Sequence, residues 1–325
     1  MPLTLELSVG DLAGVRLAIS PLSETISGLQ TLGRSWGRSR HEPWTQWAAR
    51  QLAARPLDLS RTWPLIASGL PRWPQFLLPA PAKAVTTIDE ALAAMRATAP
   101  DQVRGSLERV FGSRPPSAVR QLAADPVSGM RAVATELREA HDRLIAPHWE
   151  RIRAVLDADV AYRARRWAEG GASRLFADLH GELTWQDGRL TLEGDNRPSP
   201  GRPAGGLVLS PLVLGPPVVL IKLNTTTQTT VRYPARGVGA LWTERRPAAG
   251  NVVRLLGCRR AELLEVLRAP GTVTGLAERM RVSPSAVSQH LRVLRESGLV
   301  TGERAGRTVA YRTTEEGLRL LGGGR

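Results

Sequence analysis

The stretch from residue 272 to residue 313 restricts the fold more than any other part of the chain, because its pattern changes abruptly from helical to strand-like. Ser283 followed by Pro284 predicts the start of a helix, since serine side chains cap helices and a proline in the first helical position loses no hydrogen bond. The apolar positions that then recur at helical spacing are Val287, Leu291 and Leu294. They predict a helix with a single buried stripe.

The residues on either side of this helix complete the pattern of a winged helix-turn-helix. Thr274 is expected to cap a preceding helix, and residues 281–282 are expected to form the turn between the two helices. Gly298 is expected to end the second helix in the left-handed conformation. Two alternating runs, 299–301 and 308–311, flank a tip that contains glycine and predict a β-hairpin.

The outward face of the second helix carries short or forked hydrogen-bonding side chains, which suit base edges in a DNA major groove. An interaction module that touches no nucleic acid is the alternative, but no acidic residue stands between Pro284 and Arg295. His290 borders the buried stripe, so packing and DNA contact both stay open for it. Arg304 and Arg307 suit phosphate or minor-groove contacts. The candidate DNA contacts on the helix are Ser283, Ser285, Ala286, Ser288, Gln289 and Arg292.

This part of the chain, about residues 250–322, resembles the ArsR/SmtB family of bacterial repressors. The residues that carry the resemblance are 276–279, 282–291 and 294–300, with Arg307, Tyr311 and Arg312 in the wing. The resemblance implies a homodimer in which each recognition helix enters a major groove of an inverted-repeat operator, and it adds Arg312 to the candidate DNA contacts. It also implies that a ligand releases the operator.

Metal sensing, which is typical of the founding members of that family, is not expected for this chain. Thr272 and Thr274 stand where the resemblance would place a pair of thiolates, and no histidine follows His290 for the second type of family site. Cys258 is the only cysteine, which excludes a two-thiolate metal site within one chain. The sequence therefore predicts neither a metal nor a cofactor.

Charge is concentrated towards the C-terminal end. The net charge is +14, and residues 241–325 contribute +7 of it through 15 arginines and 8 glutamates. A higher density of positive charge beside a helix-turn-helix pattern favours nucleic acid as the partner. The first residues lack a basic stretch followed by an apolar block, and no apolar run approaches the length of a membrane span. A cytoplasmic protein without a membrane partner is expected.

The pattern along the chain predicts a mainly α fold with small β parts (α+β). A winged helix-turn-helix at 251–325 follows a linker at 244–250, which is polar and broken by proline and glycine. The N-terminal domain, 1–243, is expected to be helical over 1–175 and β-rich over 180–235, with a small antiparallel sheet. A first helix is expected to be capped by Asp11 and to contain Leu12, Val15 and Ile19. Further helices are expected at 22–32, 88–97, 103–110, 119–124 and 129–166, the last with a break at Ala146-Pro147.

The β-rich part begins with a clear turn signal. Asp187-Gly188 lies between two alternating runs, and this pair suits the left-handed turn of a two-residue hairpin. Further strands are expected at 207–209, 218–223 and 229–233, and an exposed loop at 195–206. The N-terminal half also resembles, more loosely, an uncharacterised domain that precedes ArsR-like winged helices in actinobacterial regulators. The residues carrying this second resemblance are 11–16, 20–22, 147–152, 159–160 and 233–237; it implies an architecture but no activity.

No catalytic constellation can be assembled from the N-terminal residues. Four histidines, His41, His141, His148 and His180, do not share a helical face in pairs, so surface or hydrogen-bonded histidines are favoured over a metal site or triad. Residues 237–239 lack the third glycine of a dinucleotide loop. Five tryptophans crowd together with prolines and predict either a core between short helices or, as the alternative, a pocket for a small organic effector. They are Trp36, Trp44, Trp47, Trp63 and Trp73.

Two classes of function follow from these observations. The favoured one is a non-enzymatic DNA-binding transcriptional regulator, an ArsR-like repressor that binds an inverted repeat as a homodimer and whose N-terminal domain senses a non-metal ligand or a partner. The alternative is an enzyme or a protein-interaction module that carries a winged helix for autoregulation or targeting. A pocket that brings ionisable groups together would favour the enzyme.

Overall fold

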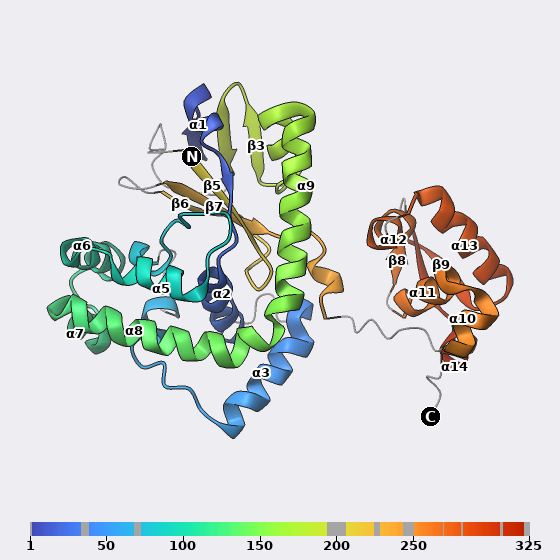
Figure 1. Ribbon diagram of the computed structural model, residues 1–325, viewed down its shortest axis with the longest axis horizontal. Helices are drawn as coiled ribbons and strands as arrows, with labels where there is room; N and C mark the ends of the chain where they lie inside the picture. Colours follow the sequence, from blue (N-terminus) through green and yellow to red (C-terminus); the bar gives the residue numbers. More distant parts are fainter. Residues whose placement is uncertain are drawn as a thin grey trace. The chain divides into compact units, whose positions relative to one another are not determined.

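The computed structural model describes residues 2–33, 39–67, 73–193, 206–223, 228–242, 250–268, 270–280, 282–305 and 308–321. The chain forms two compact units, 1–242 and 243–325 (Figure 1). The linker expected at 244–250 and the loop expected at 195–206 lie almost entirely outside the described residues. The mainly α fold with small sheets is confirmed.

Helices make up most of the N-terminal unit, and the five helical stretches expected between 22 and 166 are all present. The break expected at Ala146-Pro147 is a π-helical turn, His141–Ile145, followed by a 3-10 turn, Ala146–His148. The helices are α1 (Val9–Ala13), α2 (Pro21–Gly33), α3 (Glu42–Ala54), α4 (Trp63–Ile66), α5 (Ile88–Arg96), α6 (Pro100–Phe111), α7 (Ser117–Ala124), α8 (Pro126–Ala140) and α9 (Trp149–Phe176). The strands are β1 (Leu3–Glu6), β2 (Arg16–Leu17), β3 (Leu183–Gln186), β4 (Arg189–Leu192), β5 (Leu207–Leu212), β6 (Leu220–Lys222) and β7 (Thr229–Pro234).

The predicted hairpin is confirmed as β3 and β4. Its two turn residues have positive φ angles, 49° at Asp187 and 76° at Gly188, as a two-residue hairpin turn requires. β1 adds to the outer side of β4, so the small sheet is antiparallel in the order β1-β4-β3. The register aligns Leu3 with Leu192 and Leu5 with Leu190, which puts these leucines on one buried face.

The strands expected at 207–209, 218–223 and 229–233 are present as β5, β6 and β7, but with β2 they form a separate second sheet in the order β2-β5-β7-β6, which was not expected (Figure 1). It is mixed rather than antiparallel, because β2 pairs with β5 and β5 with β7 in parallel, and only β6 runs antiparallel to β7. Parallel pairing joins segments far apart in sequence, so no local turn signal announces it. One face of the sheet is apolar and belongs to a core shared with the β1-β4-β3 sheet and the end of α9.

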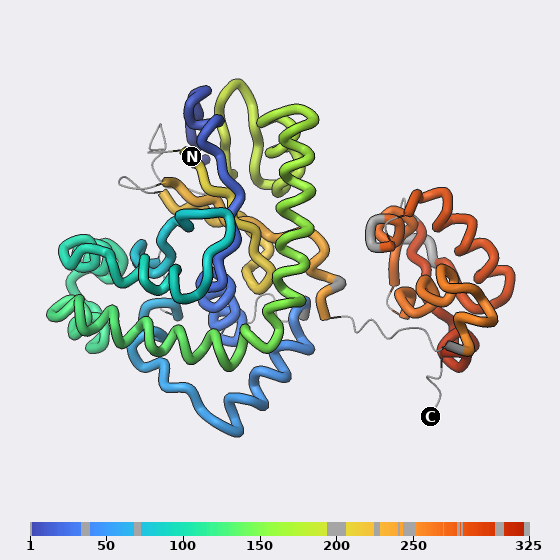
Figure 2. The backbone as a smooth tube through the Cα atoms, viewed as in Figure 1, coloured from blue at the N-terminus to red at the C-terminus, as the bar shows by residue number. Residues whose placement is uncertain are grey.

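The larger core of this unit lies among the helices, with α2 at its centre (Figure 2). α2 buries polar residues as well as apolar ones. Glu24, which is fully buried, accepts hydrogen bonds from the backbone N–H groups of Val213 and Leu214 at 2.7 and 2.8 Å. Burial raises the pKa of Glu24 to about 7, against the opposing effect of those two bonds. Glu24 therefore joins α2 to the segment that follows β5.

Two local predictions were wrong. Asp11 does not cap a helix that reaches Ile19: the cap of α1 is Ser8, and Asp11 bonds back to the Ser8 N–H in a capping box. The chain then leaves the helix, so Val15 and Ile19 lie outside it and Arg16–Leu17 forms β2. In the C-terminal unit, Gly275 N–H bonds to the hydroxyl of Thr272 at 3.3 Å, so Thr272 and not Thr274 receives the bond at the start of that helix.

The C-terminal unit has the order expected of a winged helix-turn-helix. Gly257, with φ of 80°, separates its first two helices. The hairpin strands pair antiparallel, and a short strand joins them in the order β8-β10-β9. The elements are α10 (Gly250–Leu256), α11 (Cys258–Val266), β8 (Gly271–Thr272), α12 (Val273–Met280), α13 (Pro284–Glu296), β9 (Val300–Ala305), β10 (Thr308–Thr313) and α14 (Glu315–Leu320). Within the described residues of the whole chain, no helix is both long and apolar enough to cross a membrane.

Candidate nucleic-acid interface

The position of α13 is determined by its buried stripe. Val287, Leu291 and Leu294 are at most 2% exposed and pack in one core with residues of α11 and α12. Ser283 accepts a hydrogen bond from the Ala286 N–H at 3.2 Å, and Pro284 follows it, so the predicted start of the helix is confirmed. Gly298 has φ of 71°, as its predicted role at the C-terminal end of the helix requires. The helix is therefore held in a fixed orientation.

The opposite face of α13 is open to solvent. Ser285, Ser288, Gln289 and Arg292 are exposed, and Ala286 and His290 are partly buried at its edges. The hydroxyls of Ser283 and Ser285 lie 2.9 Å apart. The Arg292 guanidinium bonds to the Glu296 carboxylate at 2.9 Å, one helical turn further on, with both side chains largely exposed. Five of the six candidate residues therefore sit on an exposed surface, with one acid at its C-terminal end.

The hairpin carries the remaining candidates. Arg312 is exposed on β10, and Arg304 lies in β9 opposite Val309 in the antiparallel register. Arg307 lies outside the described residues. β9 and β10 follow directly after α13, because Gly298 reverses the chain and Leu299 bonds back to the Leu294 carbonyl at 2.9 Å. The geometry thus brings a helix face and a hairpin together within one compact unit.

Cys258 is exposed and begins α11. Thr272 lies in β8 and Thr274 in α12, the positions that the family resemblance would give to thiolates. Among the residues that the structure describes, no group of three or more histidines, cysteines or carboxylates lies together in a way that could hold a metal ion.

The histidines of the N-terminal unit make local contacts, and two of them, His41 and His148, both meet the ring of Trp242. His41 accepts a hydrogen bond from the Trp242 indole at 2.9 Å, and burial, followed by the charge of Arg40, lowers the pKa of His41 to about 4. His141 lies 3.1 Å from the Thr25 hydroxyl. His148 packs edge-on against Trp47, with ring centroids 4.4 Å apart, and His180 lies 3.1 Å from the Pro217 carbonyl. These four side chains do not form a triad.

The crowded tryptophans mostly belong to the helical core. Trp44 is 1% exposed and donates to the Leu144 carbonyl at 3.1 Å, while Trp47, Trp63 and Trp73 are half-buried against the same core. Trp36 lies outside the described residues. Trp63 also lines a shallow hollow with Phe111 and neighbouring residues. Trp44 and its neighbours therefore fit the first alternative given for the tryptophans, a core between short helices.

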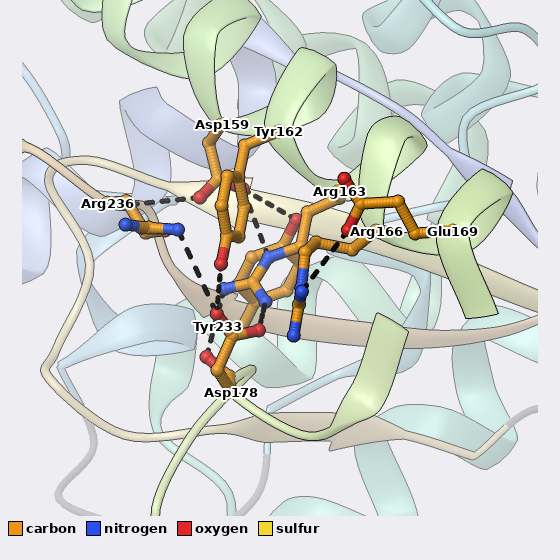
Figure 3. Close-up of polar contacts among 8 residues, drawn as sticks. All are labelled: Asp159, Tyr162, Arg163, Arg166, Glu169, Asp178, Tyr233 and Arg236. Carbon is orange, nitrogen blue, oxygen red and sulfur yellow. Dashed lines mark hydrogen bonds and ion pairs between the residues drawn. The ribbon is translucent and has the colours of Figure 1, made fainter. Parts of the chain in front are cut away.

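A network of charged and phenolic groups ties α9 to β7 (Figure 3). Asp159, 1% exposed, accepts from the Tyr233 hydroxyl at 2.8 Å and from the Arg236 N–H at 3.1 Å. The buried Arg163 guanidinium bonds to the carboxylate and carbonyl of Asp178. Burial raises the pKa of Asp159 although Arg163 opposes this. Sequence reasoning missed the network, because its members come from three separate segments.

Comparisons with known proteins agree with the geometry of the C-terminal unit. Residues 259–301 match the model of the family described as bacterial regulatory protein, arsR family. The C-terminal region of the chain is an ArsR-family helix-turn-helix domain. This ArsR-family domain is 40% identical over 73 residues to the HTH-type transcriptional repressor SmtB of Mycobacterium tuberculosis, covering 22% of this chain and 54% of the repressor. It is 51% identical over 49 residues to the HTH-type transcriptional regulator NmtR of the same organism, covering 15% and 41%.

A solved structure also matches the ArsR-family region. It is the crystal structure of a possible transcriptional regulator for arsenical resistance, 40% identical, covering 24% of this chain and 74% of that one with a TM-score of 0.18. The chain spans about half the length of the curated relatives it matches. The family model confirms the ArsR resemblance over residues 259–301, and the two curated relatives support DNA-binding regulation through the C-terminal region.

Proposed function

We propose that the protein is a sequence-specific transcriptional repressor that binds an inverted-repeat operator as a homodimer. The observation that carries the proposal is the exposed face of α13, where Ser285, Ser288, Gln289 and Arg292 stand on a helix whose other side is buried. In an ArsR-family domain this arrangement supports insertion of α13 into a major groove. The N-terminal unit would then sense a non-metal ligand or a partner.

The chemistry of the side chains assigns some of them to base recognition and others to phosphate contacts. Gln289 can make two hydrogen bonds with one adenine edge, and a serine hydroxyl can contact any base. Ser283 and Ala286 would lie close to the duplex at the start of the helix. Arg304, Arg307 and Arg312 would neutralise phosphates, which releases counterions and makes the affinity dependent on salt. A two-fold dimer would select half-sites about one helical turn apart.

Gln289→Ala and Arg312→Ala are expected to affect DNA binding differently. Loss of Gln289 should reduce discrimination at one base-pair position by about 1–3 kcal/mol, because its hydrogen bonds depend on the base. Loss of Arg312 should weaken binding to all sequences similarly and make the salt dependence less steep by about one phosphate contact. Fluorescence anisotropy with the selected operator and with random duplexes, at several salt concentrations, measures both effects. Equal losses on both kinds of DNA for both variants would contradict this division.

Glu296→Gln is expected to strengthen binding to all duplexes several-fold. The change removes a negative charge from the end of α13 and frees Arg292 from its 2.9 Å ion pair. Glu262→Gln is the matched control, because it removes the same charge from another exposed Arg–Glu pair, that of Arg259 on α11. Anisotropy titrations at fixed salt compare the two variants. If Glu262→Gln had the same effect, net charge rather than the position of Glu296 would explain the change.

A further inference from the structure

The two faces of the β2-β5-β7-β6 sheet differ sharply in chemistry. The apolar face carries Leu209, Ile221, Val231 and Tyr233, which lie in the core. On the other face, the strand register places Ser210 beside Arg232 and Lys222 beside Thr230. Side chains that are directly paired on neighbouring strands point to the same side of a sheet. The sheet therefore presents two cations and two hydroxyls together on a face where a purely structural sheet would carry apolar groups.

Both cations are buried without a negative partner. Arg232 is 4% exposed, and Lys222 is also largely buried. The Lys222 ammonium donates to the Leu78 carbonyl at 2.6 Å and the Arg232 guanidinium donates to the same carbonyl at 3.3 Å. Within the described part of the chain, neither side chain forms an ion pair with a carboxylate. One neutral carbonyl offsets buried positive charge poorly, so burial favours loss of the Lys222 proton and a bound anion would favour keeping it.

Polar atoms around the two cations also lack partners. Arg232 Nε, Ser210 Oγ and Thr230 Oγ1 are buried and make no hydrogen bond within the described part of the chain. Ser210 is 1% exposed and Thr230 is fully buried. Buried polar groups in native proteins are nearly always hydrogen-bonded, and a cluster of three exceptions on one face calls for a missing partner. Arg232 Nε can only donate a hydrogen bond, and the two hydroxyls can donate as well as accept, so a single acceptor group could satisfy all three atoms.

The segment that covers this face contributes only neutral acceptors. The carbonyl of Leu78 contacts Lys222 and Arg232, and the carbonyls of Pro81 and Ala82 accept from Arg16 of β2 at 2.9 and 3.1 Å. Residues 78–82 thus pass over the sheet from β6 to β2, the two edge strands, and contact a cation on each of them. Charged acceptors form stronger hydrogen bonds with guanidinium and ammonium groups than carbonyls do.

We propose that the polar face of the β2-β5-β7-β6 sheet binds a small anion through its carboxylate or phosphate oxygens. Lys222 and Arg232 supply the charge, and Ser210 and Thr230 donate hydrogen bonds to the same oxygens. The anion displaces the Leu78 carbonyl from the two cations. The inference deepens the proposed function, since this anion is the ligand that the N-terminal unit would sense, but its binding can be measured without DNA.

Burial also changes the pKa values of the two cations. Burial, and then the charge of Arg232, lowers the pKa of Lys222 to about 7, and burial lowers the pKa of Arg232 to about 10. A bound anion favours the ammonium form and must therefore raise the pKa of Lys222. The chain has only two lysines, and Lys83 is on the surface beside Glu90. Lys83 is thus an internal control within the same protein.

The test is an NMR titration of the full chain with 15N-labelled lysine side chains. Sodium phosphate and sodium acetate are added separately, with sodium chloride keeping the ionic strength constant. A saturable change at Lys222 with either anion, a raised Lys222 pKa and an unchanged Lys83 signal are expected. Phosphate alone would assign a phosphoryl ligand, and acetate alone a carboxylate ligand. If neither anion changed the Lys222 signal, or if Lys83 responded equally, the proposal would be overturned.

Two variants make the test specific to this face. Ser210→Ala and Thr230→Val remove one hydroxyl each, and each is expected to weaken binding of the effective anion on the order of five- to tenfold. Tryptophan fluorescence shows whether each variant is folded. Unchanged affinity in both folded variants would overturn the proposed site. DNA affinity is measured independently: anion binding without operator binding would reject the proposed function alone, and operator binding without anion binding would reject only this inference.

Discussion

Replacing Asp159 with alanine is expected to destabilise the N-terminal unit by about 2–5 kcal/mol, because the change leaves two donors without their acceptor and removes a carboxylate close to the buried Arg163, which keeps its bonds to Asp178. The donors are the Tyr233 hydroxyl and the Arg236 N–H, and Arg163, 1% exposed, lies 3.9 Å away. Urea unfolding followed by tryptophan fluorescence measures the effect. All nine tryptophans lie before residue 243, so this signal reports the N-terminal unit alone.

Asp157→Ala is the matched control for this experiment. Asp157 is exposed on the same helix and pairs with Arg153 at 3.3 Å, so its loss is expected to cost less than about 1 kcal/mol. Asp159→Asn should lie between the two, since an amide keeps one acceptor oxygen but loses the charge. If Asp159→Ala and Asp157→Ala unfolded at the same urea concentration, the network in Figure 3 would not stabilise the fold.

Leu291→Ala is expected to cost the C-terminal unit about 2–5 kcal/mol and to abolish operator binding. Leu291 is 2% exposed in the core between α13 and its neighbours, and truncation there leaves a cavity. Hydrogen exchange measured by mass spectrometry should show faster exchange throughout α13 and β10. The urea transition seen by tryptophan fluorescence should not change, because the C-terminal unit contains no tryptophan.

Gln289→Ala, in the same helix, distinguishes an effect on base recognition from an effect on folding. Gln289 is exposed two positions from Leu291, so its loss should leave hydrogen exchange unchanged while altering base preference. If Leu291→Ala bound the operator normally, the orientation of α13 would not matter for DNA binding. That result would contradict the role that we assign to the helix.

Features determined by neighbours in sequence could be predicted. The turn at Asp187-Gly188 and the start of α13 at Ser283-Pro284 depend on the chemistry of two or three adjacent residues, and both are confirmed. The errors at Asp11 and Thr274 are of the same local kind. In each case an N–H near the start of the helix bonds to the hydroxyl of a residue three positions earlier, which is Ser8 in the first helix and Thr272 in the second.

Features that join distant segments could not be predicted. The parallel pairing of β5 with β7 and the bond from Tyr233 to Asp159 depend on where the helices bring the chain back. The polar face of the sheet is only weakly indicated by the sequence. Thr230 and Arg232 alternate with Val231 and Tyr233, as residues do in a strand that has one polar and one apolar face. Only the structure shows that this face is buried and that Lys222 lies on it.

The most direct test of the account is selection of bound fragments from randomised duplex DNA, with the full chain at near-physiological salt and Gln289→Ala in parallel. An enriched inverted repeat with half-sites about one helical turn apart is predicted for the wild type, with one position relaxed in the variant. If the folded wild type enriched no sequence, either with or without phosphate or acetate, this result would contradict sequence-specific DNA binding by α13.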